Sequence, residues 1–286
     1  MNLYTPADAV ATYRDAGVKK ASLSIWKMLI LGILAGAFIA FAGALTNTAV
    51  HSLTNVSVIR IVCGLLFPFG LIMVILSGAE LFTGNTMMVI AVLEKKAKFA
   101  SMLRNWLFVY IGNFIGGVLV AIGCAFSGQM NYSSGGLAVY TIKTAVGKCS
   151  LAFGDAIVLG IMCNILVCLA VLISVSAKDV PGKVLGAYIP VAVFVLLGFE
   201  HSVANMYYVP AGLFALNVPE YAAKAVEAGI DTSMLTWGNF LLRNLLPVTI
   251  GNIIGGAGLG AALWACHLRK SASATVSAKE EKIEIS

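Results

Sequence analysis

The sequence predicts an all-α integral membrane protein of six transmembrane helices, arranged as two inverted repeats of three. Composition, six long apolar segments and an internal repeat predict this fold. Of the 286 residues, 59% are hydrophobic and only 11% are charged, and the mean hydropathy is +0.92. These values do not fit a soluble domain and are typical of a chain that lies mostly in a lipid bilayer.

Six apolar segments follow one another along the chain. A helix of about 20 apolar residues crosses the hydrocarbon core of a bilayer. The first, third, fourth and sixth segments reach that length, whereas the second and fifth fall short unless the crossing continues beyond Glu80 and Glu200. The six segments cover residues 27–53, 61–78, 104–127, 155–177, 184–199 and 239–266.

Two motifs occur twice. Residues 104–117 and 243–256 are nearly the same sequence, and residues 78–85 and 198–205 share the pattern Gly-x-Glu-x-x-x-x-Asn. The matching pieces are strongly apolar, so the repeat indicates a duplicated membrane bundle. Because each half holds three spans, an odd number, the second half enters the membrane upside down relative to the first.

We therefore expect a single transmembrane channel domain over residues 1–270. Repeat one covers about 27–127 and repeat two about 155–266. Residues 271–286 are rich in Ser, Ala, Lys and Glu, a composition that predicts a disordered cytoplasmic tail.

Two further stretches are expected to be linkers on the outer side of the membrane. The first, residues 128–154, is rich in Gly and Ser. The second, residues 209–238, opens at Pro210 and is predicted to hold a short surface helix over residues 220–227.

Positive charge orients the bundle. With the N-terminus inside and alternating spans, 14 of the 19 Lys and Arg residues lie on the inner side. This bias predicts cytoplasmic N- and C-termini for a multi-pass protein of the cell inner or plasma membrane. The net charge of +6 therefore needs no nucleic-acid partner. The five outer residues are Arg60, Lys143, Lys148, Lys224 and Arg243.

Segments two and five are the short ones, and both hold helix breakers. Paired interrupted helices in an inverted repeat indicate a binding site at the midplane of the membrane. Each break frees backbone N–H groups at the positive end of the following half-helix, and that end favours an anion. The matching breakers are Pro68, Gly70, Gly78 and Gly84 in one half and Gly186, Pro190 and Gly198 in the other.

Polar residues at the two breaks also match. Ionised side chains at this depth cost roughly 2–3 kcal/mol each, so they need a reason to be there. We interpret them as supports that cap the broken helix ends, in preference to direct substrate contact. They are Glu80 and Asn85 in the first half, and Glu200 and Asn205 in the second.

His201 differs from these supports. Its counterpart in the repeat is Leu81, so the symmetry of packing does not require a histidine. A lone buried histidine is usually a satisfied core residue. Here it lies on a broken span beside the hydroxyl of Thr83 from the other half, and we interpret it as a pore-lining proton-exchange or selectivity group.

The residues at the breaks carry a resemblance to a known family. At residues 80–83 and 199–206 the chain resembles the formate/nitrite transporter family, and the similarity extends from Gly17 to His267. The resemblance implies an aquaporin-like protomer with helices two and five broken at mid-membrane. It also implies a homopentamer in which each protomer has its own anion pore. Within the family, the chain looks most like the clostridial hydrosulfide ion channel branch.

The same resemblance implies roles for individual residues. Thr83 and His201 would form the pore centre, flanked by two hydrophobic constrictions and by a lysine vestibule at each end. Helical spacing alone favours ordinary core or lipid contacts for the flanking apolar residues. The implied cytoplasmic constriction is Leu71, Phe82 and Val167, the outer one is Phe67, Leu81 and Phe194, and the vestibule and polar pore positions are Lys20, Lys148 and Asn164.

The leading hypothesis is a pH-sensitive channel that passes a small monovalent anion without a cofactor. Hydrosulfide would be the substrate, with formate and nitrite as related ones. The alternative is a neutral-solute channel for water or glycerol, although neither break holds an Asn-Pro-Ala motif. A membrane enzyme subunit or an assembly scaffold is a third hypothesis, and a scaffold would leave the two breaks unexplained. The enzyme subunit is disfavoured because only one of the three histidines lies at mid-span depth, and neither paired catalytic acids nor a metal motif occurs in the sequence.

Overall fold

The computed structural model describes residues 3–269 of the chain. Within this range the chain is helical apart from turns and one isolated bridge between Leu3 and Ala177. The predicted all-α class is therefore confirmed for the described part. The tail predicted at 271–286 lies outside the described residues.

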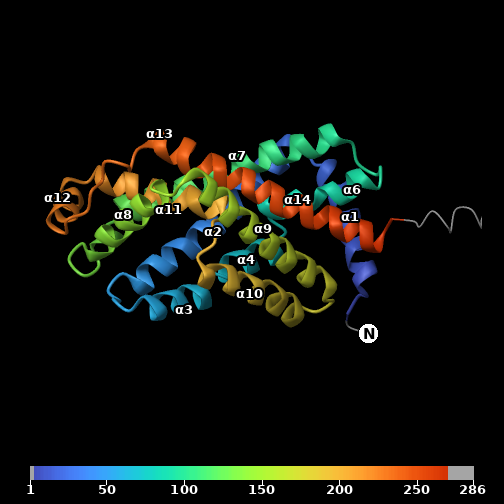
Figure 1. The fold of residues 1–286 in the computed structure, drawn as a ribbon, viewed down its shortest axis with the longest axis horizontal. Coiled ribbons are helices and arrows are strands. Elements are labelled where there is room, and N and C mark those ends of the chain that lie inside the picture. Colours follow the sequence, from blue (N-terminus) through green and yellow to red (C-terminus); the bar gives the residue numbers. More distant parts are fainter. Residues whose placement is uncertain (1–2, 270–286) are drawn as a thin grey trace, which may run out of the picture.

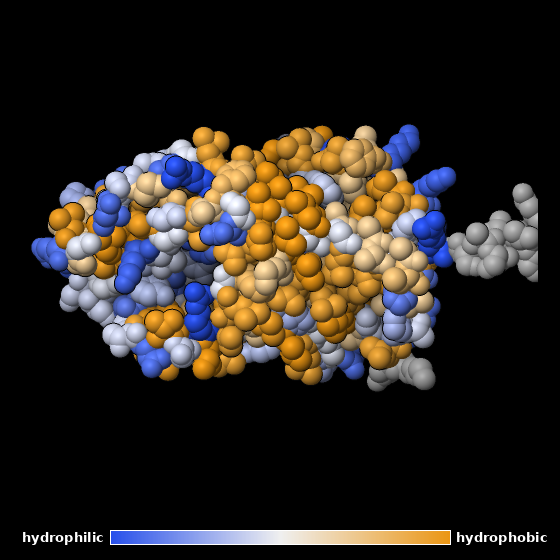
Figure 2. Space-filling model, viewed as in Figure 1, coloured by the Kyte–Doolittle hydropathy of each residue, from blue (hydrophilic) through white to orange (hydrophobic). Residues whose placement is uncertain are grey.

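Six helical spans are long and apolar enough to cross a membrane, as the sequence predicts. Figure 2 shows apolar residues over the middle of the long axis and hydrophilic residues toward both ends. The spans are α2 (Ile25–Val50), α3 (Val56–Leu66) with α4 (Phe69–Ser77), α7 (Phe99–Phe126), α9 (Phe153–Ser176), α10 (Val180–Leu197), and α13 (Trp237–Asn239) continued by a π-helical turn (Phe240–Leu245) into α14 (Leu246–His267).

The two halves repeat the same order of elements. Each half opens with a short helix before its first span and places a short helical segment after its broken span. In the first half these are α1 (Pro6–Ala21), and α5 (Phe82–Asn85) with the 3-10 turn η1 (Thr86–Met88) and α6 (Val89–Leu93). In the second half they are α8 (Gly136–Cys149) and α11 (Ser202–Leu216).

The expected linkers are more structured than the sequence indicates. The stretch 128–154 holds α8, which packs on α11 through residues such as Ala145. The stretch from 209 is not a linker at its start, because α11 runs through Pro210 and ends at Leu216. The short surface helix is confirmed as α12 (Pro219–Glu227). In the first linker, a short 3-10 turn, η2 (Gln129–Asn131), precedes α8.

Two long helix pairs form the frame of the molecule, α2 against α7 and α9 against α14. Both crossings depend on glycine. A Cβ atom on Gly36 or Gly116 would collide with the backbone of the facing helix, and the same holds for Gly251 and Gly255. Small residues let helix backbones approach closely where no water drives association.

Each half contains one broken span, and the breaks match. Gly78 ends α4 with φ 71°, and Gly198 ends α10 with φ 76°. These left-handed conformations favour glycine. Three residues of extended or irregular chain follow each glycine before the next helix begins. Pro68 lies at the kink between α3 and α4, whereas Pro190 lies inside α10 without interrupting it.

The long axis of the molecule has two distinct ends (Figure 1). At one end, which we call the Lys20 end, lie α1, α6 and the last turn of α14. Contacts join these elements, such as the bond from Trp264 Nε1 to Glu94 Oε1. At the other end, which we call the Lys148 end, lie α8 and α12, which pack together, and Lys224 Nζ of α12 donates to the Ser134 carbonyl in the turn before α8.

Candidate functional site

The first break is held by an asparagine from a neighbouring span. Asn113 of α7 accepts a hydrogen bond from the Phe82 N–H at 2.9 Å and donates to the Glu80 and Gly32 carbonyls at 2.9 and 2.8 Å. Its side chain is fully buried. One amide therefore satisfies backbone groups on both sides of the break, which otherwise would be left unpaired in an apolar surrounding.

The second break is held in the same way. Asn252 of α14 accepts from the Ser202 N–H at 2.9 Å and donates to the Glu200 and Gly160 carbonyls at 3.0 and 2.8 Å. The sequence predicts that the side chains of Glu80, Asn85, Glu200 and Asn205 cap the broken helix ends. This prediction is wrong in detail, because none of these side chains accepts a hydrogen bond from a freed N–H group in the part of the chain that the structure describes. The first N–H group of each short helix is capped by an asparagine of another span, and in α11 the Ala204 N–H is capped by His201.

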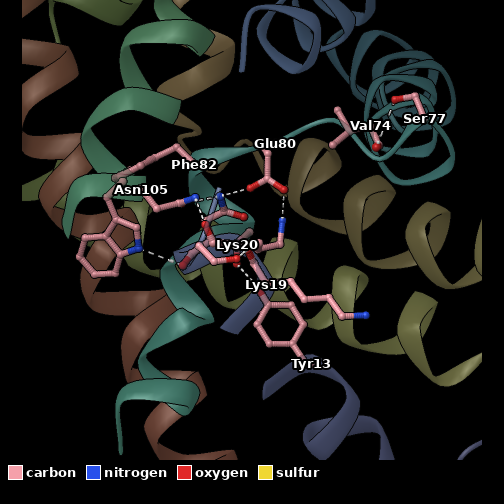
Figure 3. Close-up of polar contacts among 12 residues, drawn as sticks. Tyr13, Lys19, Lys20, Val74, Ser77, Glu80, Phe82 and Asn105 are labelled. Atoms are coloured by element: carbon pink, nitrogen blue, oxygen red, sulfur yellow. Dashed lines mark hydrogen bonds and ion pairs between the residues drawn. The ribbon is translucent and has the colours of Figure 1, made fainter. Parts of the chain in front are cut away.

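The two glutamates form ion pairs instead. Lys20 Nζ lies 2.6 Å from Glu80 Oε1, and Lys148 Nζ lies 2.6 Å from Glu200 Oε1. Figure 3 shows Lys20 reaching Glu80 from α1, close to Asn105. Both carboxylates are 5% exposed. A buried charge is tolerated when it is paired and hydrogen-bonded, and each lysine supplies that pairing.

A second asparagine completes each network. Asn85 Nδ2 donates to Glu80 Oε2 at 2.6 Å and to Asn105 Oδ1 at 2.8 Å. In the other half the corresponding bonds run from Asn205 to Glu200 and Asn244, at 2.7 and 2.8 Å. These contacts fix the glutamate oxygens and leave each lysine as the outermost member of its network.

Thr83 and His201 come together between the two breaks, although 118 residues separate them. Thr83 Oγ1 lies 2.9 Å from His201 Nε2, and both residues are at least 97% buried. The N–H of Ala204 donates to His201 Nδ1 at 3.2 Å. Since Nδ1 accepts, the ring proton of the neutral imidazole is on Nε2, the nitrogen that faces Thr83.

Asn164 does not line the space around this pair. Its amide donates to the carbonyls of Thr83 and Asn252 at 3.2 and 2.6 Å and to Thr86 Oγ1 at 3.0 Å. These bonds occupy the amide nitrogen, and Asn164 is not among the residues that line the three cavities described below, so its role as a polar pore position stays a prediction. Asn164 instead links the backbone that carries Thr83 to the residue that caps the second break.

Two cavities enter the molecule from opposite ends. The Lys148 cavity has a volume of about 370 Å³ and the Lys20 cavity about 220 Å³. The first reaches Glu200 and His201, and the second reaches Glu80 and Leu81. Each cavity therefore ends at one break, with its lysine on the wall.

A narrow apolar gap separates the two cavities. Its volume is about 10 Å³, at the lower limit for a single water molecule. Phe67 and Phe194 pack edge to face there, with ring centroids 6.0 Å apart. The gap is lined by Ile39, Phe67, Leu71, Leu81, Val167, Val191, Phe194 and His201.

Two of the expected constriction residues are placed differently. Leu81 lines the gap and the Lys20 cavity, so it belongs with Leu71 and not with the outer pair of phenylalanines. Phe82 lines none of the three cavities described. It packs against Trp106 and Tyr110, with ring centroids 6.2 and 4.8 Å apart. The backbone is extended at Leu81, so consecutive side chains point to opposite sides.

Some residues of the site are absent from the sequence-based prediction. Ile39 and Val191 line the gap, and Val191 stands three residues before Phe194 on the same helix face. The network asparagines of α7, the π-helical turn and α14 occur in the repeated Arg-Asn and Gly-Asn pairs, but only packing shows what they contact. These four are Asn105, Asn113, Asn244 and Asn252.

Comparison with known proteins gives the family. The formate/nitrite transporter family model matches residues 7–266. The chain belongs to the formate/nitrite transporter family. It is 37% identical to the formate channel FocA of Escherichia coli over 94% of this chain and 96% of that protein, and 36% identical to the formate channel BtFdhC of Bacillus thuringiensis over 94% and 98%.

Solved structures agree with this assignment. A pentameric formate channel with formate bound superposes with a TM-score of 0.73 at 34% identity, covering 86% of this chain and 98% of that one. An ion channel of the same family gives a TM-score of 0.77 at 26% identity over 90% and 98%. The chain is thus a multi-pass membrane transport protein of a family of channels and transporters, not an enzyme.

Proposed function

We propose that the protein passes small monovalent anions through a pore in each protomer, with Thr83 and His201 at the centre. One observation carries the proposal. Two cavities from opposite ends, each with a lysine on its wall, converge on one apolar gap where a buried hydroxyl and imidazole meet. Lysine at both mouths favours anions over the neutral solutes of the alternative hypothesis.

The groups along this path suggest an order of events. The lysine ammonium group on each cavity wall can contact an entering anion, although it is paired with a glutamate. The apolar gap then removes hydration water, and a soft, weakly hydrated anion loses less there than a hard one. The Nε2–H of His201 and the hydroxyl of Thr83 replace part of the lost hydration and offer a proton to the anion.

We infer that hydrosulfide is carried, with formate and nitrite as related substrates. Two relatives are named formate channels, and the superposed pentamer contains formate. The same likeness supports a homopentamer in which each protomer conducts independently. A competition panel of hydrosulfide, formate, nitrite and lactate at two pH values in proteoliposomes will rank the substrates.

The decisive test replaces the imidazole. His201→Phe keeps an aromatic ring but removes the Nε2–H donor, so anion flux in proteoliposomes should be abolished or lose its pH response. His267→Phe, at the exposed end of α14, is the matched control and should leave flux unchanged. Equal flux and equal pH response in His201→Phe and wild type would remove this residue from the mechanism. Rapid swelling in water or glycerol without anion dependence would favour the neutral-solute channel.

A further inference from the structure

Arg60 of α3 is a cation that the transport path described above does not use. It lies on the wall of the Lys148 cavity, together with Tyr140 and Glu200. Within residues 3–269 no carboxylate lies within ion-pair distance of its guanidinium, whereas Lys148 is paired with Glu200. Arg60 is also solvent-exposed, so its charge is available to an ion that enters this mouth.

The guanidinium of Arg60 is positioned by the break. It lies against the backbone of Gly198, where an added Cβ would be 2.6 Å from Nη1 and 3.1 Å from Cζ and Nη2. The absence of a side chain at Gly198 makes this approach possible. Arg60 therefore lies beside Gly198, the residue three positions before His201 at the second break.

Arg60 makes the two mouths unequal. The Lys20 cavity is lined by one cation and one anion, Lys20 and Glu80, which pair with each other. The Lys148 cavity has the same pair and Arg60 in addition, which leaves one uncompensated positive charge. The repeat does not require it, because the offset that relates Glu80 to Glu200 is 120 residues and brings Arg60 onto Val180.

The free donors in this cavity define the ligand. A guanidinium presents parallel N–H groups that match two oxygens in one plane, which a lysine cannot do. Tyr140 lines the same cavity and supplies a phenol hydroxyl as a second donor. We propose that Arg60 and Tyr140 form an anion-selecting site in the Lys148 vestibule for planar two-oxygen anions, namely formate and nitrite. This proposal rests on the proposed function and adds that the Lys148 mouth selects formate and nitrite.

Directional uptake tests the site. Intact cells and inverted vesicles that contain the full-length protein present the anion to opposite mouths. In the preparation that exposes the Lys148 mouth, Arg60→Gln should raise the half-saturating concentration of formate and nitrite about three- to tenfold, the effect of losing one partly screened charged hydrogen bond. Arg60→Lys keeps the charge but not the planar fork, so it should leave the half-saturating concentration of hydrosulfide at the wild-type value and should not restore those of formate or nitrite.

Lys143→Gln is the matched control, since it removes one exposed positive charge from α8 outside the cavity lining. It should change no half-saturating concentration. If Arg60→Gln leaves formate and nitrite unchanged, or if Arg60→Lys behaves as wild type toward every anion, the proposed two-oxygen site is wrong. In both cases flux through the wild-type pore persists, so the proposed function stands. Absence of flux in the wild type would instead overturn the proposed function.

Chemical modification gives a readout that does not need transport. A membrane-impermeant phenylglyoxal added at the Lys148 side should modify Arg60, and formate should slow that modification whereas chloride at equal concentration should not. Mass spectrometry compares Arg60 with Arg14, Arg104, Arg243 and Arg269 in the same sample. Equal protection by formate and chloride would contradict the site even if the variants were poorly folded.

Discussion

Buried polar side chains decide how the two breaks are built. Asn113, Asn252, Glu80 and Glu200 are each at least 95% buried, and every one of them makes several hydrogen bonds. In a lipid environment no water can hydrogen-bond to an unpaired polar group, so the backbone groups freed at each break need hydrogen-bond partners from the protein. The breaks are therefore specifically bonded features of the fold, although Ser202 Oγ and Asn205 Oδ1 at the second break are buried without a hydrogen-bond partner among the described residues.

The Lys20–Glu80 pair allows this view to be tested. Lys20→Met leaves the buried carboxylate unpaired and should lower the free energy of unfolding by about 2–4 kcal/mol. The double variant Lys20→Met, Glu80→Gln should recover part of that loss, because the uncompensated charge is gone. Thermal unfolding in detergent of the wild type, the two single variants and the double variant measures these changes in stability as a double-mutant cycle.

The exposed pair Lys224–Glu220 supplies the control. Its carboxylate side chain is 59% exposed, so Glu220→Gln should cost less than about 1 kcal/mol. Additive effects of Lys20→Met and Glu80→Gln would contradict the interpretation of a coupled, buried pair.

At the scale of elements, the two broken spans differ in what surrounds their terminal glycines. Gly78 and Gly198 share a left-handed backbone, but a Cβ on Gly78 meets nothing within 4 Å, whereas one on Gly198 meets the Arg60 guanidinium. Replacing either glycine by alanine should therefore strain the left-handed backbone, and only the replacement at Gly198 should also displace the Arg60 guanidinium.

Gly78→Ala and Gly198→Ala should each lower the free energy of unfolding by about 1–2 kcal/mol, the cost of a side chain in a left-handed conformation. Only Gly198→Ala should also weaken formate uptake, because the flexible Arg60 side chain must move away. Thermal unfolding and uptake are measured on both variants. A loss of formate affinity in Gly78→Ala of the same size would show that strain, and not displacement of Arg60, is the cause.

The spans and the two breaks could be predicted because hydropathy and repeated glycine and glutamate positions carry that information locally. The sequence could not predict that Leu81 faces the gap and that Phe82 packs against Trp106 and Tyr110. Helical spacing does not apply there, because the backbone is extended at Leu81. The role of α8 was also hidden, since its modest hydropathy resembles a linker. The bonds of Asn113 and Asn252 depend on which span packs beside each break, and that is a property of the assembled bundle.

At the scale of the whole molecule, the chain has two ends of different chemistry. The Lys20 end gathers α1, α6 and the last turn of α14, and the Lys148 end gathers α8 and α12 (Figure 1). The charge bias of the sequence predicts that the Lys20 end faces the cytoplasm. This orientation is a prediction that two native cysteines can test.

Cys63 lines the Lys148 cavity, and Cys266 is exposed near the end of α14. A membrane-impermeant maleimide added to intact cells should label Cys63 but not Cys266, and inverted vesicles should give the opposite result. Mass spectrometry of the two peptides reads the labelling, and Cys63→Ser and Cys266→Ser identify each signal. Labelling of Cys266 in intact cells would reverse the predicted orientation.

The asparagines that hold the two breaks bond only to main-chain atoms of the residues around them. Leu81 and His201 thus occupy equivalent positions beside the same supports, and only His201 adds a cap of its own, because its Nδ1 accepts from the Ala204 N–H. Because the supporting asparagines bond to the main chain, one half can carry a leucine and the other a histidine at this position while the supports stay the same. Two equivalent backbone supports that carry different side chains thus give a symmetric scaffold an asymmetric interior.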